Sequence, residues 1–134
     1  MTVASERSNL SAMRLIMDNL PPSLRGQREA IENCLRAMAA ALPLQAVYLF
    51  GSHARGEARP DSDVDLCVVA EDAAAQLRAS QRLSEAILGV WPRPAFTLIP
   101  ITPQRLAEKQ AIGDHFFNTV LAQGVLLATE DGLQ

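Results

Sequence analysis

The sequence predicts an α/β (α+β) domain with a small mixed β-sheet and helices packed mainly on one side of it. The chain has 134 residues, of which 49% are hydrophobic, which is enough for one domain to bury its own core. Short segments rich in β-formers alternate with longer segments of helical periodicity. Their order, helices first and then β-β-α-β-α, is typical of a mixed sheet. We therefore expect a single domain over residues 1–134, with N-terminal helices over 1–43 and a core over 44–128.

Two helices are expected before the core. The first, over residues 8–20, has apolar side chains at mostly helical spacing: Leu10, Met13, Ile16, Met17 and Leu20. Two prolines at 21 and 22 stop this helix. The second helix is expected over residues 24–41. Its inner face carries Ile31, Leu35 and Met38.

The core is expected to begin with the buried strand LQAVYLF, residues 44–50, which ends at Gly51. A second strand is expected over residues 62–70. The helix after it, within residues 72–91, is expected to point its large apolar side chains inward: Leu77, Leu83, Ile87 and Leu88.

The C-terminal part predicts a strand, two helical segments and a last strand. Pro100 suggests that the strand over residues 95–102 lies at an edge of the sheet or ends there. Thr102 followed by Pro103 is a good helix start. The last helical segment contains DHFFNTVLAQG and is closed by Gly124, which leaves VLLAT as a short final strand.

Charge and cysteine usage exclude several classes of protein. The formal net charge of −3 argues against an extended nucleic-acid surface, because such surfaces need many phosphate contacts from Lys and Arg. Cys34 and Cys67 match no metal-ligand spacing, so each is expected to be a small buried hydrophobe. The N-terminus lacks the pattern of a signal peptide, and no apolar run reaches transmembrane length. We expect a cytoplasmic protein that does not bind a membrane.

The pair Asp63 and Asp65 suggests a cation site. Side chains on a strand alternate between its faces, so both carboxylates are expected on one face, about 7 Å apart between α-carbons. The apolar Val64, Leu66 and Val68 then face inward. Two adjacent carboxylates repel each other, and a divalent ion such as Mg²⁺, usually held by one or two carboxylates and substrate phosphates, removes that repulsion.

The turn before the loop suggests an anion site. Gly51 lets the chain leave the first strand without a Cβ in the way, and Ser52 can offer its N–H and hydroxyl at the start of a short helix. Arg55 comes one helical turn later. Singly, each feature is also typical of an ordinary turn or a solvated strand edge. Together they suit a nucleoside triphosphate with its metal ion.

The segment FGSHARGEARPDSDVDLCVV resembles the signature of the DNA polymerase beta-like nucleotidyltransferase superfamily, and most closely its minimal nucleotidyltransferases. The resemblance implies the nucleotidyltransferase fold. It implies that Gly51, Ser52 and Arg55 bind the phosphates of a nucleotide. It further implies that Asp63 and Asp65 are catalytic and hold Mg²⁺ or Mn²⁺, with ATP as the substrate.

The activity implied by the resemblance is transfer of a nucleoside monophosphate, AMP from ATP, to a hydroxyl acceptor. In small members of the family the acceptor is often on a protein, and the usual partner is a helical HEPN-type toxin that the nucleotidyltransferase neutralises as an antitoxin. The alternative is a degenerate module that binds a nucleotide or a partner and transfers nothing. The sequence leaves the acceptor and the oligomeric state open.

One element of the family pattern is missing. Active members carry a third carboxylate on the next strand, where this chain has Thr97, and no Asp or Glu occurs between Glu85 and Glu108. Asp61 is expected to cap the loop or to form a salt bridge with Arg59. His53, at the variable position of the signature, is expected at the surface, and Glu71 is too far along its strand to replace the acid.

Overall fold

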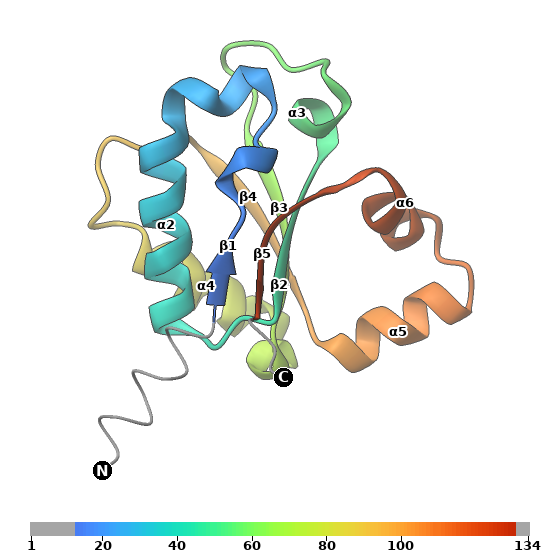
Figure 1. The fold of residues 1–134 in the computed structure, drawn as a ribbon. Helices are drawn as coiled ribbons and strands as arrows, with labels where there is room; N and C mark the ends of the chain where they lie inside the picture. Colours follow the sequence, from blue (N-terminus) through green and yellow to red (C-terminus); the bar gives the residue numbers. More distant parts are fainter. Residues whose placement is uncertain (1–12, 131–134) are drawn as a thin grey trace.

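Five strands form one mixed β-sheet at the centre of the structure (Figure 1), a computed structural model that describes residues 13–130. The strands are β1 (Met13–Leu15), β2 (Ala46–Phe50), β3 (Val64–Val69), β4 (Phe96–Ile101) and β5 (Val125–Glu130). Their order across the sheet is β1-β5-β2-β3-β4. Strands β3 and β4 are parallel, and the other neighbours are antiparallel. The predicted mixed sheet is confirmed, and Pro100 lies on the edge strand β4.

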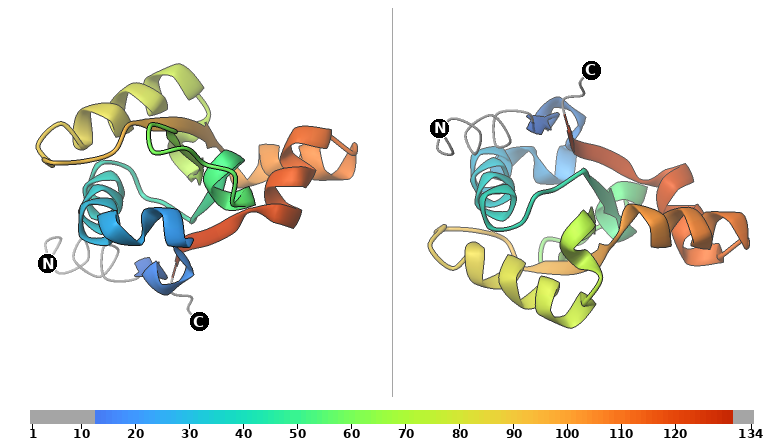
Figure 2. Two further views of the ribbon diagram at one scale, coloured as in Figure 1. Left: turned by 90° about the horizontal axis from the view of Figure 1, so that it is seen from above. Right: turned by 90° about the horizontal axis from the view of Figure 1, so that it is seen from below.

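Helices lie on both faces of this sheet (Figure 2). Helices α2 (Arg28–Ala41) and α4 (Gln76–Ala86) cover one face, and α5 (Pro103–Ala111) and α6 (His115–Gln123) lie against the other. The shorter helices are α3 (Gly51–Arg55) and the 3₁₀ turns η1 (Met17–Asn19), η2 (Pro22–Gln27) and η3 (Glu71–Ala73). No helix within residues 13–130 is both long and apolar enough to cross a membrane.

The larger core lies between the sheet and helices α2 and α4. The predicted inner face of α2 is confirmed, because Ile31, Leu35 and Met38 are buried there. On β3, the alternation also follows the prediction, and the residues that join this core are Val64, Leu66 and Val68.

A smaller core lies on the opposite face, where Cys67 packs with Phe117 and Val120 of α6. Burial raises the pKa of the Cys67 thiol to about 12 and also raises that of Cys34. Both cysteines are free and buried, so they are small hydrophobes, as the sequence predicts.

The helix predicted over residues 8–20 is wrong in its described part, and residues 8–12 lie outside the described chain. Residues 13–15 form β1, which pairs with β5 in the register Met13 to Glu130. The N–H of Ile16 donates to the Leu127 carbonyl at 2.8 Å. Met17 and Leu20 still reach the core. The apolar spacing therefore reflects core contacts made by an extended and 3₁₀ segment, because pairing with β5 outweighs local helix propensity.

The predicted inner face of α4 is half correct. Leu83 and Ile87 are buried, whereas Leu77 is 75% exposed and Leu88 is 66% exposed. Ala79, Leu83 and Ile87 are four residues apart and share one helix face. Leu77 lies on another face, and Leu88 comes after the helix has ended. Counting apolar residues without fixing the helix face and the helix end therefore misplaced one side chain each, Leu77 and Leu88.

Candidate functional site

Strands β2, β3 and β4 bring the residues of the signature to one edge of the sheet. Phe50, the last residue of β2, is paired with Asp65 on β3. Asp65 is in turn paired with Thr97 on β4. Gly51 follows Phe50 directly, so the Gly-Ser turn, Asp65 and Thr97 lie side by side. The expectation that Thr97 stands next to the two aspartates is confirmed.

Gly51 allows the backbone to approach Asp65 closely. Its φ is +78°, and a Cβ built on it would overlap Oδ2 of Asp65. A side chain at this position would therefore suffer both a rarely adopted backbone conformation and a clash with the carboxylate. The sequence predicted a turn that needs glycine, and the structure shows that the neighbour requiring it is Asp65.

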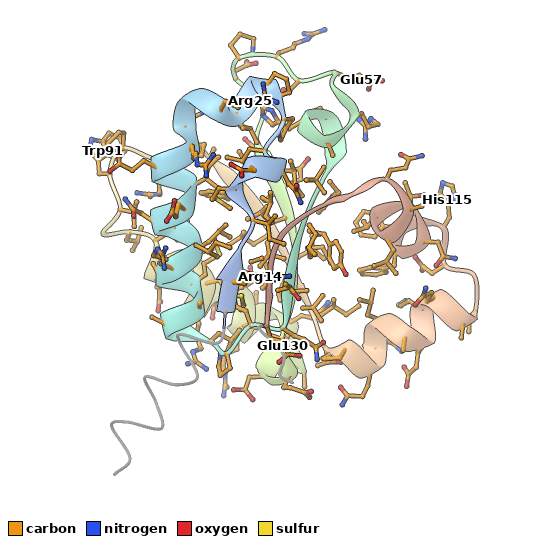
Figure 3. The ribbon with its side chains drawn as sticks, in the orientation of Figure 1. Arg14, Arg25, Glu57, Trp91, His115 and Glu130 are labelled. Carbon is orange, nitrogen blue, oxygen red and sulfur yellow. The ribbon has the colours of Figure 1, made fainter. Side chains whose placement is uncertain are left out.

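Helix α3 consists of Gly51–Arg55 and ends at Gly56, whose φ is +73°. The Nε of Arg55 donates to Oε1 of Glu57 at 3.0 Å, and the Arg55 side chain is 49% exposed. Glu57 lies at the same end of the molecule as α3 (Figure 3). Arg55 lies one turn after Ser52, as expected. Its ion pair is at the surface, where such pairs contribute little to stability.

Asp63 lies just before β3 and not within it, because the strand begins at Val64. Its side chain is exposed, and Oγ1 of Thr97 donates to its Oδ2 at 3.2 Å. The predicted strand over residues 62–70 is therefore shorter at both ends. The pair Asp63 and Asp65 nevertheless comes together with Thr97, which occupies the space beside both carboxylates.

The pKa of Asp65 is raised above its usual value. Partial burial is the main cause, and the nearby Asp63 carboxylate also raises it. The Thr97 hydroxyl, His53 and Arg55 oppose the shift. The site therefore disfavours a second negative charge in the absence of a cation.

This shift predicts a pH dependence of stability. A carboxyl with a raised pKa in the folded chain binds more protons when folded, so the free energy of unfolding falls as pH rises from the unfolded pKa through the folded one. Asp65→Asn removes this loss. Urea denaturation from roughly pH 3 to pH 7 should show the variant gaining stability over the wild type as pH rises. Two curves that stay parallel over the whole range would contradict the role assigned to Asp65.

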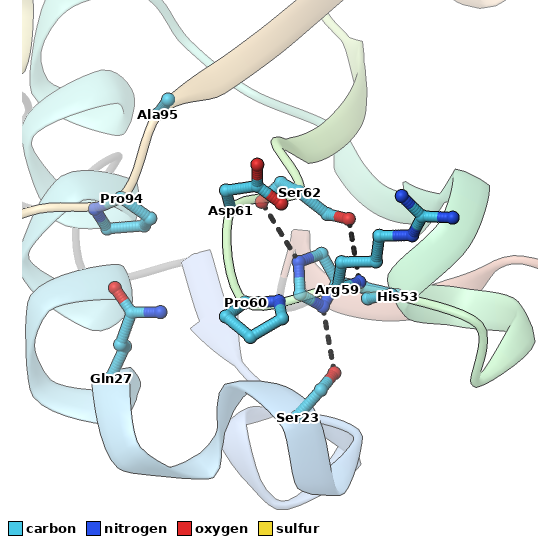
Figure 4. A pocket seen from close by; sticks show the side chains of 10 residues that line it. Ser23, Gln27, His53, Arg59, Pro60, Asp61, Ser62, Pro94 and Ala95 are labelled. Carbon is cyan, nitrogen blue, oxygen red and sulfur yellow. Dashed lines mark hydrogen bonds between the residues drawn. The ribbon is translucent and has the colours of Figure 1, made fainter.

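His53 is buried, which corrects the expectation that it lies at the surface. It is 5% exposed. One ring nitrogen, Nδ1, lies 2.8 Å from Oγ of Ser23, and the other, Nε2, lies 3.2 Å from the Ser62 carbonyl (Figure 4). No local signal in the sequence identifies these partners, because Ser23 is 30 residues away. Their contact depends on how η2 folds back over α3.

A pocket of about 550 Å³ lies beside His53. It is bounded by η2, by the loop over residues 58–62 and by residues 94 and 95 (Figure 4). Asp61 lines it, but among residues 13–130 Asp61 forms no ion pair with Arg59, so the salt-bridge alternative for Asp61 is wrong. The loop is closed by Ser62, because the Arg59 N–H donates to its Oγ at 2.8 Å.

The donor set determines which ion this edge could hold. Within residues 13–130, no three His, Cys, Asp or Glu side chains come together as metal ligands. Asp63 and Asp65 offer oxygen ligands alone, and their mutual repulsion contributes to the raised pKa of Asp65. Such a pair fits Mg²⁺ or Mn²⁺ when a substrate phosphate supplies further oxygens. Glu71 follows the other end of β3, where it accepts a hydrogen bond from Gln104 at 3.4 Å. It is therefore not part of this edge.

Comparison of the chain with known proteins identifies its family. The chain is 30% identical to a proposed minimal nucleotidyltransferase of known structure, over 75% of this chain and 89% of the other, with a TM-score of 0.43. It is 21% identical to a proposed nucleotidyltransferase from Sulfolobus solfataricus, over 73% of this chain and 76% of the other, with a TM-score of 0.48. No protein of curated function matches the chain. Residues 31–111, more than half of the chain, match the nucleotidyltransferase domain. The chain belongs to the nucleotidyltransferase domain family.

Proposed function

We propose that the protein transfers AMP from ATP to a hydroxyl acceptor. The acceptor oxygen attacks the α-phosphorus, the bond from that phosphorus to the bridging oxygen breaks, and pyrophosphate leaves. The hydroxyl proton passes to solvent. The observation that carries the proposal is the meeting of the Gly51 turn with Asp63 and Asp65 at one sheet edge.

Gly51, Ser52 and Arg55 bind the phosphates in this proposal. The lack of a Cβ at Gly51 lets the Asp65 carboxylate lie against the start of α3, so phosphates bound at this turn would be next to a cation held by Asp65. Arg55 is bound to Glu57 through one surface contact, and a phosphate can offer its guanidinium two parallel charge-assisted hydrogen bonds in place of that one. Replacing the contact of Arg55 with Glu57 by a contact with a phosphate therefore costs little free energy.

Asp63 and Asp65 are the proposed catalytic carboxylates and the ligands of Mg²⁺ or Mn²⁺. When bound, the ion would supply positive charge that stabilises the oxygens around the reacting phosphorus. The two carboxylates would hold the ion close to the Gly51 turn. Partial burial is the main cause of the raised pKa of Asp65, and repulsion by Asp63 adds to it; this repulsion favours uptake of a cation together with the nucleotide.

A second candidate function is nucleotide binding without transfer. The observation that favours it is Thr97, whose hydroxyl donates to Asp63 where a carboxylate could otherwise accept the proton of the acceptor. General-base assistance contributes about 10²–10⁴ in rate. Its loss would slow transfer while leaving the phosphate and cation contacts in place.

We propose a helical HEPN-type protein as the partner and the cytoplasm as the compartment. The resemblance of residues 50–69 to minimal nucleotidyltransferases supports this partnership. In this reading the acceptor hydroxyl belongs to the partner, and the protein acts as its antitoxin.

Incubation with α-labelled ATP, Mg²⁺ or Mn²⁺ and the product of the neighbouring gene tests the function. Label on protein, with release of pyrophosphate, is the expected result. Binding of ATP by calorimetry without label under either metal would instead establish the binding module. Absence of both binding and label would overturn both candidates.

Thr97→Asp tests the role of the missing carboxylate. The new carboxylate would lie beside Asp63 and Asp65, because Thr97 is paired with Asp65. We expect the labelling rate to rise by about 10²-fold, the lower end of general-base effects. Thr97→Asn has nearly the same shape without the charge and should give no increase. Equal rates for the two variants would show that the acid is supplied elsewhere or is not needed.

A further inference from the structure

We propose that His53 is a positioning residue that holds the loop before Asp63 in place, through its bond to the Ser62 carbonyl. The inference rests on the proposed function, because the loop leads directly into a proposed metal ligand. It assigns a role to the only buried polar or charged side chain among residues 13–130. The second bond of the same ring, to Ser23, has a different role from the bond to Ser62.

The two hydrogen bonds of His53 define how its ring is used. A carbonyl oxygen only accepts, so Nε2 must carry the hydrogen that it donates to Ser62. In the neutral ring Nδ1 is then an acceptor, and it receives the hydroxyl hydrogen of Ser23. One side chain of α3 is therefore bound to η2 on one side and to the loop on the other (Figure 4).

The loop that His53 holds is a small closed turn. The Ser62 N–H donates to the Arg59 carbonyl at 3.0 Å, and the Arg59 N–H donates to the Ser62 hydroxyl at 2.8 Å. The Ser62 carbonyl is left pointing at His53. Asp63 follows in the chain, and the N–H of Val64 then donates to the Ala95 carbonyl. The residues on both sides of Asp63 are therefore held in place: Ser62 by His53, and Val64 by its bond to Ala95.

The bond from His53 to the Ser62 carbonyl connects the two sides of the proposed site. His53 follows Ser52, which is on the proposed phosphate side, and its ring reaches Ser62, which is next to the proposed metal ligand Asp63. The β2–β3 pairing already holds Asp65 next to the Gly-Ser turn. Asp63 lies outside that ladder, so the bond from His53 to Ser62 adds a link between α3 and the residue before Asp63. The bond to Ser23 ties η2 to α3, but it does not connect to either carboxylate.

Three substitutions separate the two hydrogen bonds of His53. In His53→Gln the side-chain amide can reach the position of Nε2 and still donate to Ser62. In His53→Asn the shorter amide can replace Nδ1 toward Ser23 but does not reach Ser62. Ser23→Ala removes the other bond from its far side. The three variants are compared with the wild type by thermal unfolding, by amide hydrogen exchange and by calorimetry with Mn²⁺ and ATP.

We expect His53→Asn to speed exchange at the Arg59 and Ser62 amides and to weaken ATP binding with Mn²⁺, each by about tenfold, the upper range for loss of one hydrogen bond. His53→Gln and Ser23→Ala should stay within about twofold of the wild type in both measurements. A solely structural role predicts instead that affinity follows thermal stability across all three variants.

Equal losses in His53→Gln and His53→Asn, or wild-type exchange and affinity in His53→Asn, would overturn the inference. Hydrogen exchange needs no ligand, so it decides the positioning of the loop by itself. A wild-type protein that binds no ATP with Mn²⁺ would instead overturn the proposed function. Such a result leaves the exchange comparison to support or reject the role of His53 in the loop.

Discussion

Replacement of Asp63 by Asn is expected to abolish labelling by ATP and to weaken Mn²⁺-dependent ATP binding by about 10²-fold or more. Asn is neutral and offers one oxygen, so it cannot replace a carboxylate as a ligand of a hard divalent ion. Asp65 alone would then have to hold the ion. Its partial burial makes its charged form costly. Calorimetry and the labelling assay measure the two effects separately.

The fold should tolerate Asp63→Asn. Asp63 is exposed, and the Asn side chain can still accept from Thr97, which now donates to Oδ2. The matched control is Asp61→Asn, which removes an acid from the same loop two residues earlier. It should leave labelling and affinity unchanged. If both variants lose affinity equally, general negative charge in the loop, and not a specific ligand, explains the binding.

Gly51→Ala is expected to reduce both stability and ligand binding. The φ of +78° at this position is strained for alanine, at a cost of about 1–3 kcal/mol. In addition, the new Cβ would overlap Oδ2 of Asp65, so the carboxylate must move away from the Gly-Ser turn. We expect Mn²⁺-dependent ATP binding to weaken and the labelling rate to fall by about 10²-fold, because a reacting group displaced by about 1 Å can lose that much in rate.

Gly56→Ala separates these two causes. Gly56 has nearly the same φ, +73°, but a Cβ there would meet nothing within 4 Å. It should lose about the same 1–3 kcal/mol by urea denaturation while keeping affinity for ATP. Equal losses of affinity in the two variants would show that backbone strain at α3, and not the contact with Asp65, controls the site.

The elements that could be predicted from the sequence are those determined by neighbours in the chain. Thr102 caps α5 by accepting from the Arg105 N–H at 3.1 Å, and Asp114 caps α6 by accepting from the Phe117 N–H at 2.9 Å. Period-two alternation likewise gave the correct inner face of β3. These features need only a few consecutive residues, so a single sequence contains enough information to find them.

The errors arose where distant segments determine the structure. Met13–Leu15 is a strand because β5, more than 100 residues later, offers it a partner. The side chain of His53 is buried because η2 covers it. None of these partners can be read from local spacing.

For the candidate site, the residue types and their order can be read from the chain alone: a Gly-Ser turn, an arginine, and two aspartates separated by one residue. The contacts between them, in which Gly51 packs against Asp65, Thr97 donates to Asp63 and His53 reaches Ser62, appear only in the folded protein. This is because strand alternation and turn chemistry act between near neighbours in the chain. Contacts between strands, and between η2 and α3, exist only once the sheet has formed.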